Sequence, residues 1–143
     1  MTLATDAVLD ASALIRGVLG ENDSAGAAWI EAVVAGHIRG LVPELAFAEV
    51  ANALAVSVRA RDVRTDQAHG ALNRVLGLPL DVVRLNLLIR EALRRALASR
   101  ISVYDACYLV AADAFDAVLV TADRRLARAA RKSALLPKVG PPG

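Results

Sequence analysis

Short apolar runs alternate with longer helical patterns along almost the whole chain, and this alternation constrains the fold more than any other feature. Five of the runs have the length and the Val- and Leu-rich character of β-strands. The expected strands are residues 7–9, 37–42, 80–83, 117–121 and 135–138. We expect the last strand at an edge of the sheet, because Pro137 has no N–H to donate to a neighbouring strand.

The segments between these runs have apolar spacings typical of helices. Asp23 or Ser24 can cap the second helix, and Pro43 suits the first turn of the third. The expected helices are residues 12–19, 24–35, 43 to about 60, 65–76, 85–99, 102–112 and 124–132. Strands that alternate with helices predict an α/β domain with a mainly parallel sheet, and such sheets bind ligands at the carboxyl ends of their strands.

The length of 143 residues suits one domain with a sizeable core. We expect residues 1–138 to form that domain and residues 139–143, which end in Gly-Pro-Pro-Gly, to be a disordered tail. Hydrophobic residues make up 56% of the chain and aromatic residues only 3%, so the core must consist mainly of Leu, Val, Ile and Ala. The mean hydropathy of +0.44 has two explanations: either another chain covers some apolar surface, or the protein is an Ala-rich, well-packed monomer.

Several absences limit where the protein works. No apolar run is long enough to cross a bilayer, and the first residues lack the basic and apolar regions of a signal peptide. The single cysteine, Cys107, excludes an internal disulfide and a cysteine-based zinc site. We therefore expect a cytoplasmic protein without a membrane segment. The net charge of +2 is compatible with RNA binding but supports it only weakly.

Three aspartates stand where a strand ends or a helix begins. Asp10 follows the first strand, Asp123 follows the fourth, and Asp105 completes a Ser-Val-Tyr-Asp sequence that begins at Ser102. Each of them has an ordinary explanation as a helix cap or a member of a capping box. Each would also point toward a ligand at the same edge of the sheet.

A fourth acid, Glu49, lies on a helix face that also carries Asn52. The opposite face of that helix carries an apolar stripe that includes Val50 and Leu54. Taken alone, Glu49 is best explained as a solvent-exposed side chain. Together with Asp10, Asp105 and Asp123, however, it would form a group of carboxylates that repel one another unless a cation neutralises them.

All-oxygen ligands favour Mg²⁺ or Mn²⁺ over zinc. Neither histidine, His37 or His69, lies in a pattern that suggests a metal ligand, so we interpret both as structural or surface residues. The residues alone therefore predict a magnesium or manganese site, with helix capping as the alternative for each aspartate.

Four sequence blocks resemble the PIN-domain family, in particular the toxins known as VapC. The blocks are VLDASAL around Asp10, PELAFAEVANAL around Glu49, SVYDACYLVAA around Asp105 and LVTADRRL around Asp123. The resemblance implies a three-layer α/β/α sandwich with a mainly parallel central sheet. It also implies a Mg²⁺- or Mn²⁺-dependent endoribonuclease, the toxin of a type II toxin–antitoxin pair. Asp10, Asp105 and Asp123 would hold the metal, and Glu49 would orient the attacking water or hold the metal from its other side.

Other residues also match the family's pattern. Ser12 and Thr121 correspond to hydroxyls that orient the acids, and Asn52 corresponds to an Asn near the family's Glu. Some PIN domains carry a further acid after the last motif aspartate, where this chain has Arg124 and Arg125. The site would therefore hold one ion firmly and a second only with substrate.

A short basic segment after Asp123 is a candidate for binding RNA phosphates, although a solvated helix face explains it equally well. Its arginines are Arg124, Arg125, Arg128 and Arg131. With so few aromatic residues, base stacking cannot be the main source of affinity for RNA. The expected partners are an RNA substrate such as tRNA or rRNA, a small VapB-like antitoxin and a second copy of the chain.

A silent scaffold and a phosphoacceptor module are the two alternatives to a ribonuclease. A silent PIN scaffold that binds only RNA or protein would not need to keep all four acids. A receiver-like phosphoacceptor module would need an Asp pair at the first strand and a lysine near the last strand. The chain has no Asp-Asp pair, and Lys138 is the only candidate lysine.

Overall fold

The computed structural model describes residues 5–20 and 23–138 of the chain. The expected disordered tail, residues 139–143, lies outside this part. The described residues contain a five-stranded, all-parallel sheet, which confirms the predicted α/β class. Its strands are β1 (Thr5–Leu9), β2 (Ile38–Pro43), β3 (Leu80–Val83), β4 (Val118–Thr121) and β5 (Ser133–Leu135).

The order of the strands across the sheet is β3-β2-β1-β4-β5. The chain moves outward from β1 to β2 and β3, and then returns to place β4 on the other side of β1. The order therefore reverses between β1 and β4. In open parallel sheets, ligands bind in the crevice that such a reversal leaves at the carboxyl ends of the two strands.

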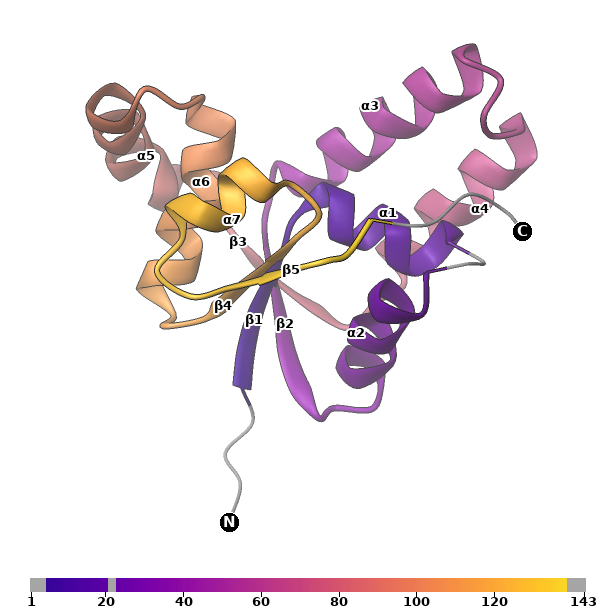
Figure 1. Cartoon of the computed structure of the whole chain (residues 1–143), viewed down its shortest axis with the longest axis horizontal. Helices are drawn as coiled ribbons and strands as arrows, with labels where there is room; N and C mark the ends of the chain where they lie inside the picture. The colour runs from indigo at the N-terminus through magenta and orange to yellow at the C-terminus, as the bar shows by residue number, and fades with distance from the viewer. Residues whose placement is uncertain (1–4, 21–22, 139–143) are drawn as a thin grey trace.

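Helices cover both faces of the sheet, as expected for a three-layer sandwich (Figure 1). They are α1 (Ala11–Leu19), α2 (Ser24–Val34), α3 (Ala46–Arg59), α4 (Thr65–Leu76), α5 (Leu85–Ser99), α6 (Val103–Ala114) and α7 (Arg124–Ala129). Helix α1 contacts α2, α3 and α4 on one side, and α5 packs on α6 on the other. In Figure 1, α3 and α4 form a hairpin that extends away from the sheet.

Helix α6 is buried more completely than the other helices. Seven consecutive residues, 106–112, are buried, because this helix packs against α5 on one side and against β1, β2 and β4 on the other. A helix with apolar side chains on all its faces must pack against other elements on more than one side. The sequence supplies small side chains at four of these seven positions, Ala106, Cys107, Ala111 and Ala112, which allows close packing. Helix α6 thereby fixes Asp105, in its first turn, relative to the sheet.

Pro43 does not begin a helix, as the sequence suggested, but ends β2. The pairing of β2 with β1 stops at Leu41, so the missing N–H of Pro43 costs no bond on that side. On the other side Pro43 pairs in register with Val83 of β3. Helix α3 begins only at Ala46, after a turn in which Glu44 accepts a hydrogen bond from the N–H of Leu85 at 2.8 Å.

The end of the domain also differs from the expectation. Helix α7 stops at Ala129, not at residue 132, and β5 covers Ser133–Leu135, not residues 135–138. The chain must leave the helix early to run beside β4, where the N–H of Leu119 already donates to the carbonyl of Lys132. Leu136 makes the last such bond, to the carbonyl of Thr121. Pro137 has no N–H and cannot continue the pairing.

Candidate active site

Asp10 lies at the reversal point of the sheet, directly after β1. Its backbone N–H donates to the carbonyl of Val120 in β4 at 3.2 Å, so the ends of β1 and β4 are joined at this residue. The Asp10 side chain is one of the few polar groups inside the core and is only 5% exposed. Burial of a carboxylate is unfavourable unless hydrogen bonds or a cation compensate for it.

Three donors compensate in part for the burial of Asp10. Oδ1 accepts the hydroxyl of Ser12 at 2.6 Å and the N–H of Ala13 at 2.9 Å, and Oδ2 accepts the hydroxyl of Thr121 at 2.5 Å. The bond to Ala13 is the helix cap that the sequence suggested. Burial nevertheless raises the pKa of Asp10, and the charge of Asp123 adds to the increase. Capping therefore explains one contact of Asp10 but not its depth in the core.

The two hydroxyls also tie the segment after β4 to Asp10. The N–H of Ala122 donates to Ser12 Oγ at 3.0 Å, and the N–H of Asp123 donates to Thr121 Oγ1 at 2.9 Å. Each hydroxyl thus donates to Asp10 while it accepts from the backbone. This network fixes the Asp10 carboxylate in one orientation.

Asp123 is the N-cap of α7, as predicted. Its Oδ1 accepts the N–H groups of Arg125 at 2.9 Å and Leu126 at 3.2 Å. Unlike Asp10, Asp123 is exposed, so its carboxylate borders the solvent side of the site. Its charge reaches Asp10, since it contributes to the raised pKa of that residue.

Glu49 belongs to the first turn of α3 and is half-buried. The sequence around Glu49, taken alone, had suggested a solvent-exposed side chain. The hydroxyl of Tyr108 donates to Glu49 Oε1 at 2.6 Å. Burial raises the pKa of Glu49, and the nearby charges of Asp105 and Asp10 raise it further. Glu49 is therefore near enough to Asp105 and Asp10 for their charges to act on it.

Tyr108 was not among the residues that the sequence singled out. It is 2% exposed, and burial together with Glu49 raises the pKa of its hydroxyl, which stays a hydrogen-bond donor. The spacing contains a usable signal, because Asp105 and Tyr108 are three residues apart and share a face of α6. A polar side chain on that face of a buried helix would be expected to find a partner in the site.

Asp105 lies where α6 begins. Its N–H donates to Ser102 Oγ at 3.0 Å, so Ser102 caps the helix as predicted. The carboxylate of Asp105 is 3.7 Å from the guanidinium of Arg125, measured from Oδ2 to Nη2. Arg125 thus lies at the edge of the acidic group and reaches it from α7.

The four acids share one electrostatic environment but do not form a closed cage. Asp10 is influenced by Asp123, and Glu49 by both Asp105 and Asp10, in each case toward a higher pKa. Within residues 5–20 and 23–138, no three acidic, histidine or cysteine side chains are close enough to ligate one ion as they stand. The donors for a divalent cation are present, and rotation of side chains would be needed to bring them onto it.

The arginines of the basic segment do not all lie together. Arg124, Arg125 and Arg128 are exposed on α7, which begins at the site. Arg131 lies beyond α7 and pairs with Asp116 at 2.8 Å. Asp116 precedes β4, so Arg131 lies near the amino end of that strand, away from the acids. Both histidines are exposed, and neither belongs to the acidic group.

A groove of about 510 Å³ opens beside Glu49. Asn52 lines it from the next turn of α3, and Tyr104 lines it from the first turn of α6. Its remaining lining is apolar and mostly small, namely Ala11, Leu45, Ala48 and Ala53. Glu49 is the one charged residue that lines this hollow, and Asp10 and Asp105 are the sequence neighbours of its lining residues Ala11 and Tyr104.

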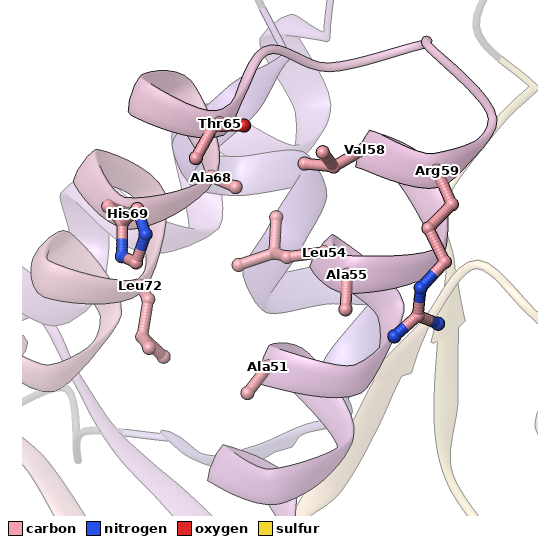
Figure 2. A pocket seen from close by; sticks show the side chains of 9 residues that line it. All are labelled: Ala51, Leu54, Ala55, Val58, Arg59, Thr65, Ala68, His69 and Leu72. Carbon is pink, nitrogen blue, oxygen red and sulfur yellow. The ribbon is translucent and has the colours of Figure 1, made fainter.

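A second hollow, of about 380 Å³, lies between α3 and α4 (Figure 2). Figure 2 shows Leu54 and Leu72 pointing into it from the two helices, with Arg59 and His69 at its margins. Its lining contains no carboxylate. This hollow suits an apolar group and is separate from the acidic site.

The PIN domain profile matches residues 7–132, which span all four acids and nearly the whole fold. The chain belongs to the PIN-domain family. Members of this family that act in toxin–antitoxin systems are nucleases. Comparison with curated proteins found no match.

Solved structures share the PIN fold over most of the chain. The protein PAE2754 of Pyrobaculum aerophilum is 27% identical, with a TM-score of 0.73 over 90% of this chain and 82% of that one. VapBC2 of Rickettsia felis, solved with a DNA fragment from its promoter, is 13% identical, with a TM-score of 0.65 over 92% of this chain and 98% of that one. A toxin–antitoxin complex from Klebsiella pneumoniae is 14% identical, with a TM-score of 0.63 over 93% and 99% of the two chains.

In the part of the chain that the structure describes, no helix has both the length and the apolar character to cross a membrane.

Proposed function

We propose that this PIN domain is a metal-dependent endoribonuclease that hydrolyses phosphodiester bonds in RNA, with tRNA or rRNA as substrate, and that it is the toxin of a toxin–antitoxin pair. The observation that carries the proposal is the burial of Asp10 at the reversal point of the sheet. Its pKa is raised by burial and by Asp123, so the free carboxylate is destabilised there. A divalent cation would remove that penalty.

The chemistry of the donors supports Mg²⁺ or Mn²⁺. Asp10, Asp105 and Asp123 offer carboxylate oxygens, and neither histidine nor the buried Cys107 belongs to the group. We assign the ion to these three aspartates, with help from Glu49, whose pKa responds to the charges of Asp105 and Asp10. When bound, such an ion lowers the pKa of a water molecule and offsets negative charge on the phosphate.

The other residues of the site have roles that follow from their contacts. Ser12 and Thr121 hold the Asp10 carboxylate in place. Glu49 is held by Tyr108 and can accept a proton from the attacking water, because its raised pKa makes it a better base than an ordinary glutamate. Arg125, beside Asp105, can hold a phosphate of the RNA, and Arg124 and Arg128 extend the same positive surface.

We also propose two protein partners. A solved structure similar to this chain, from Klebsiella pneumoniae, is described as a toxin–antitoxin complex, and the apolar hollow between α3 and α4 suits an apolar segment of a small antitoxin. A cationic side chain of that partner would complement the acids. A second copy of the chain would cover exposed apolar side chains of α5, which include Leu87, Leu93 and Leu97.

The function is tested by incubating the purified protein with total tRNA in Mg²⁺ or Mn²⁺ and with an excess of EDTA. We expect cleavage that depends on the metal and is absent from an Asp105→Asn variant. Arrest of growth when the parent, but not the variant, is expressed would support the toxin role. Cleavage that continues unchanged in EDTA would overturn the metal mechanism, and inactivity toward all cellular RNA would indicate a silent scaffold.

A further inference from the structure

Tyr104 is the most exposed aromatic residue in the part of the chain that the structure describes. Its side chain is 65% exposed, whereas Tyr108, one turn further along α6, is 2% exposed. Packing therefore explains Tyr108 but not Tyr104. A single exposed apolar side chain is ordinary on a protein surface, so a functional reason for the Tyr104 ring must come from its position.

The position of Tyr104 indicates that reason. It immediately precedes Asp105, and it lines the same groove as Glu49 and Asn52. Helix α6 supplies Tyr104 on one wall, and α3 supplies Glu49 and Asn52 on the other. The ring thus borders the hollow that Glu49 lines, and it is the sequence neighbour of Asp105.

The lining of this groove favours a flat, neutral group. Ala48 and Ala53 leave space beside the ring, and Leu45 supplies an apolar surface. A phosphate would be repelled by Glu49 in the absence of a cation, whereas a nucleobase carries no charge. Asn52, which is exposed, offers an amide donor and acceptor that could meet the edge of a base. The volume of about 510 Å³ is within the usual range for small-molecule pockets.

We propose that Tyr104 is a stacking platform for one unpaired base of the RNA, next to the phosphate that the site cleaves. This inference rests on the proposed ribonuclease function and deepens it. Single-stranded RNA is commonly held by stacking its bases on aromatic side chains. Phosphate contacts from α7 would still supply most of the affinity, in agreement with the small number of aromatic residues. Tyr104 would decide where along the strand the scissile bond lies.

The test compares RNA with and without bases. Binding of a fluorescent ten-nucleotide oligoadenylate in Mg²⁺ is measured for an Asp10→Asn protein, in which hydrolysis is expected to be lost, and for the same protein with Tyr104→Leu. Leucine keeps apolar bulk but removes the aromatic face. We expect Tyr104→Leu to weaken binding of oligoadenylate about 5- to 150-fold, and Tyr104→Phe to have little effect. Both proteins should bind an abasic oligomer of equal length equally well.

Phe115→Leu is the matched control, because Phe115 is an exposed aromatic residue at the other end of α6. It should leave oligoadenylate binding unchanged. Equal binding of oligoadenylate with and without the Tyr104 ring would overturn the proposal, as would a loss that persists with the abasic oligomer. A change of oligomeric state without a change in base-dependent binding would show that Tyr104 contacts protein instead.

A kinetic measurement separates this inference from the function on which it rests. In the otherwise unchanged enzyme, Tyr104→Leu should raise KM for RNA more than it lowers kcat, because the ring contacts a base and not the reacting atoms. If the parent cleaves RNA and Tyr104→Leu leaves KM and the cleavage position unchanged, the stacking role is wrong but the proposed ribonuclease function is supported. If no RNA is cleaved but binding depends on the base and on Tyr104, the proposed ribonuclease function is wrong but Tyr104 does bind a base.

Discussion

The hydroxyl of Thr121 donates a hydrogen bond to Oδ2 of Asp10, and this bond joins the carboxyl ends of β4 and β1 inside the core. Thr121 is fully buried and also accepts the N–H of Asp123, so one hydroxyl contacts two of the four acidic residues. The fold thereby orients the acids through a contact that links residues 111 positions apart.

Replacement of Thr121 with valine removes this hydroxyl while keeping the shape of the side chain. Asp10 loses a donor, and the N–H of Asp123 loses its acceptor. We expect the free energy of unfolding to fall by roughly 1–3 kcal/mol, since a buried carboxylate loses a hydrogen bond. Cleavage should also weaken, because Asp10 is no longer held in one orientation. Thr121→Ser, measured by the same urea titration and cleavage assay, should recover most of both losses. Equal stability of Thr121→Val and the parent would show that this bond contributes nothing.

Asp10→Asn tests the cost of the buried charge through its dependence on pH. The pKa of Asp10 is raised in the folded protein, mainly by burial, above its ordinary value of 3.8. The folded state therefore holds the proton more tightly than the unfolded state, so this residue destabilises the fold at neutral pH. The penalty is lost as the pH falls from the folded pKa toward the unfolded one. In EDTA the variant should be more stable than the parent at pH 7.

The difference in stability between the two proteins should shrink as the pH is lowered toward about 4, and thermal melts in EDTA across this range would measure it. A variant that is less stable than the parent at pH 7, or a difference that grows in acid, would contradict the assigned direction of the pKa shift.

Tyr108→Phe tests whether the buried hydroxyl positions Glu49. Phenylalanine fills the same space but cannot donate to Glu49 Oε1. We expect a small loss of stability, about 0.5–1.5 kcal/mol, because half-buried Glu49 can turn toward water. Cleavage should fall about tenfold or more if the orientation of Glu49 matters to the reaction. Glu49→Gln should lower cleavage at least as much, and combining the two changes should add little to Glu49→Gln alone. Additive losses of cleavage would show that Tyr108 and Glu49 act independently.

The sequence was sufficient to predict the α/β class, the parallel sheet and the caps at Asp10, Ser102 and Asp123, because these depend on local periodicity and on residues a few positions apart. It could not show that Tyr108 meets Glu49, since that contact joins α6 to α3 across 59 residues. It also placed Pro43 in a helix, because proline suits a first helical turn as well as the end of a strand. Only the pairing of β2 with β3 decides between these two positions.

Arg131 illustrates the same limit. The sequence places it in a basic run with Arg124 and Arg125, and the run suggested a single helix. The helix ends at Ala129, and the chain turns to form β5, which takes Arg131 to the amino end of β4. We therefore expect Arg131→Ala to leave RNA binding unchanged, whereas loss of Arg125 should weaken it.

Asp123→Asn separates a metal ligand from a helix cap. Asn caps helices about as well as Asp, so a residue that only caps should lose no more than a dipole contribution of roughly 0.3–1 kcal/mol. If Asp123 belongs to the site, its removal relieves repulsion on Asp10. The variant should then match or exceed the parent's stability in EDTA, gain less from added Mn²⁺, and lose most of its cleavage. If Asp123→Asn keeps full activity and is stabilised by Mn²⁺ as much as the parent, Asp123 serves only as a helix cap.

Direct titration of Mn²⁺ tests whether these acids bind a divalent cation, and it does not require knowledge of the RNA target. Free Mn²⁺ is followed by its electron paramagnetic resonance signal as parent, Asp10→Asn and Asp105→Asn proteins are added. We expect the parent to bind one ion in the absence of RNA, and each variant to bind it at least about tenfold more weakly, since each loses one charged ligand. Equal Mn²⁺ binding by the parent and both variants, or no binding by the parent at millimolar Mn²⁺, would contradict this expectation.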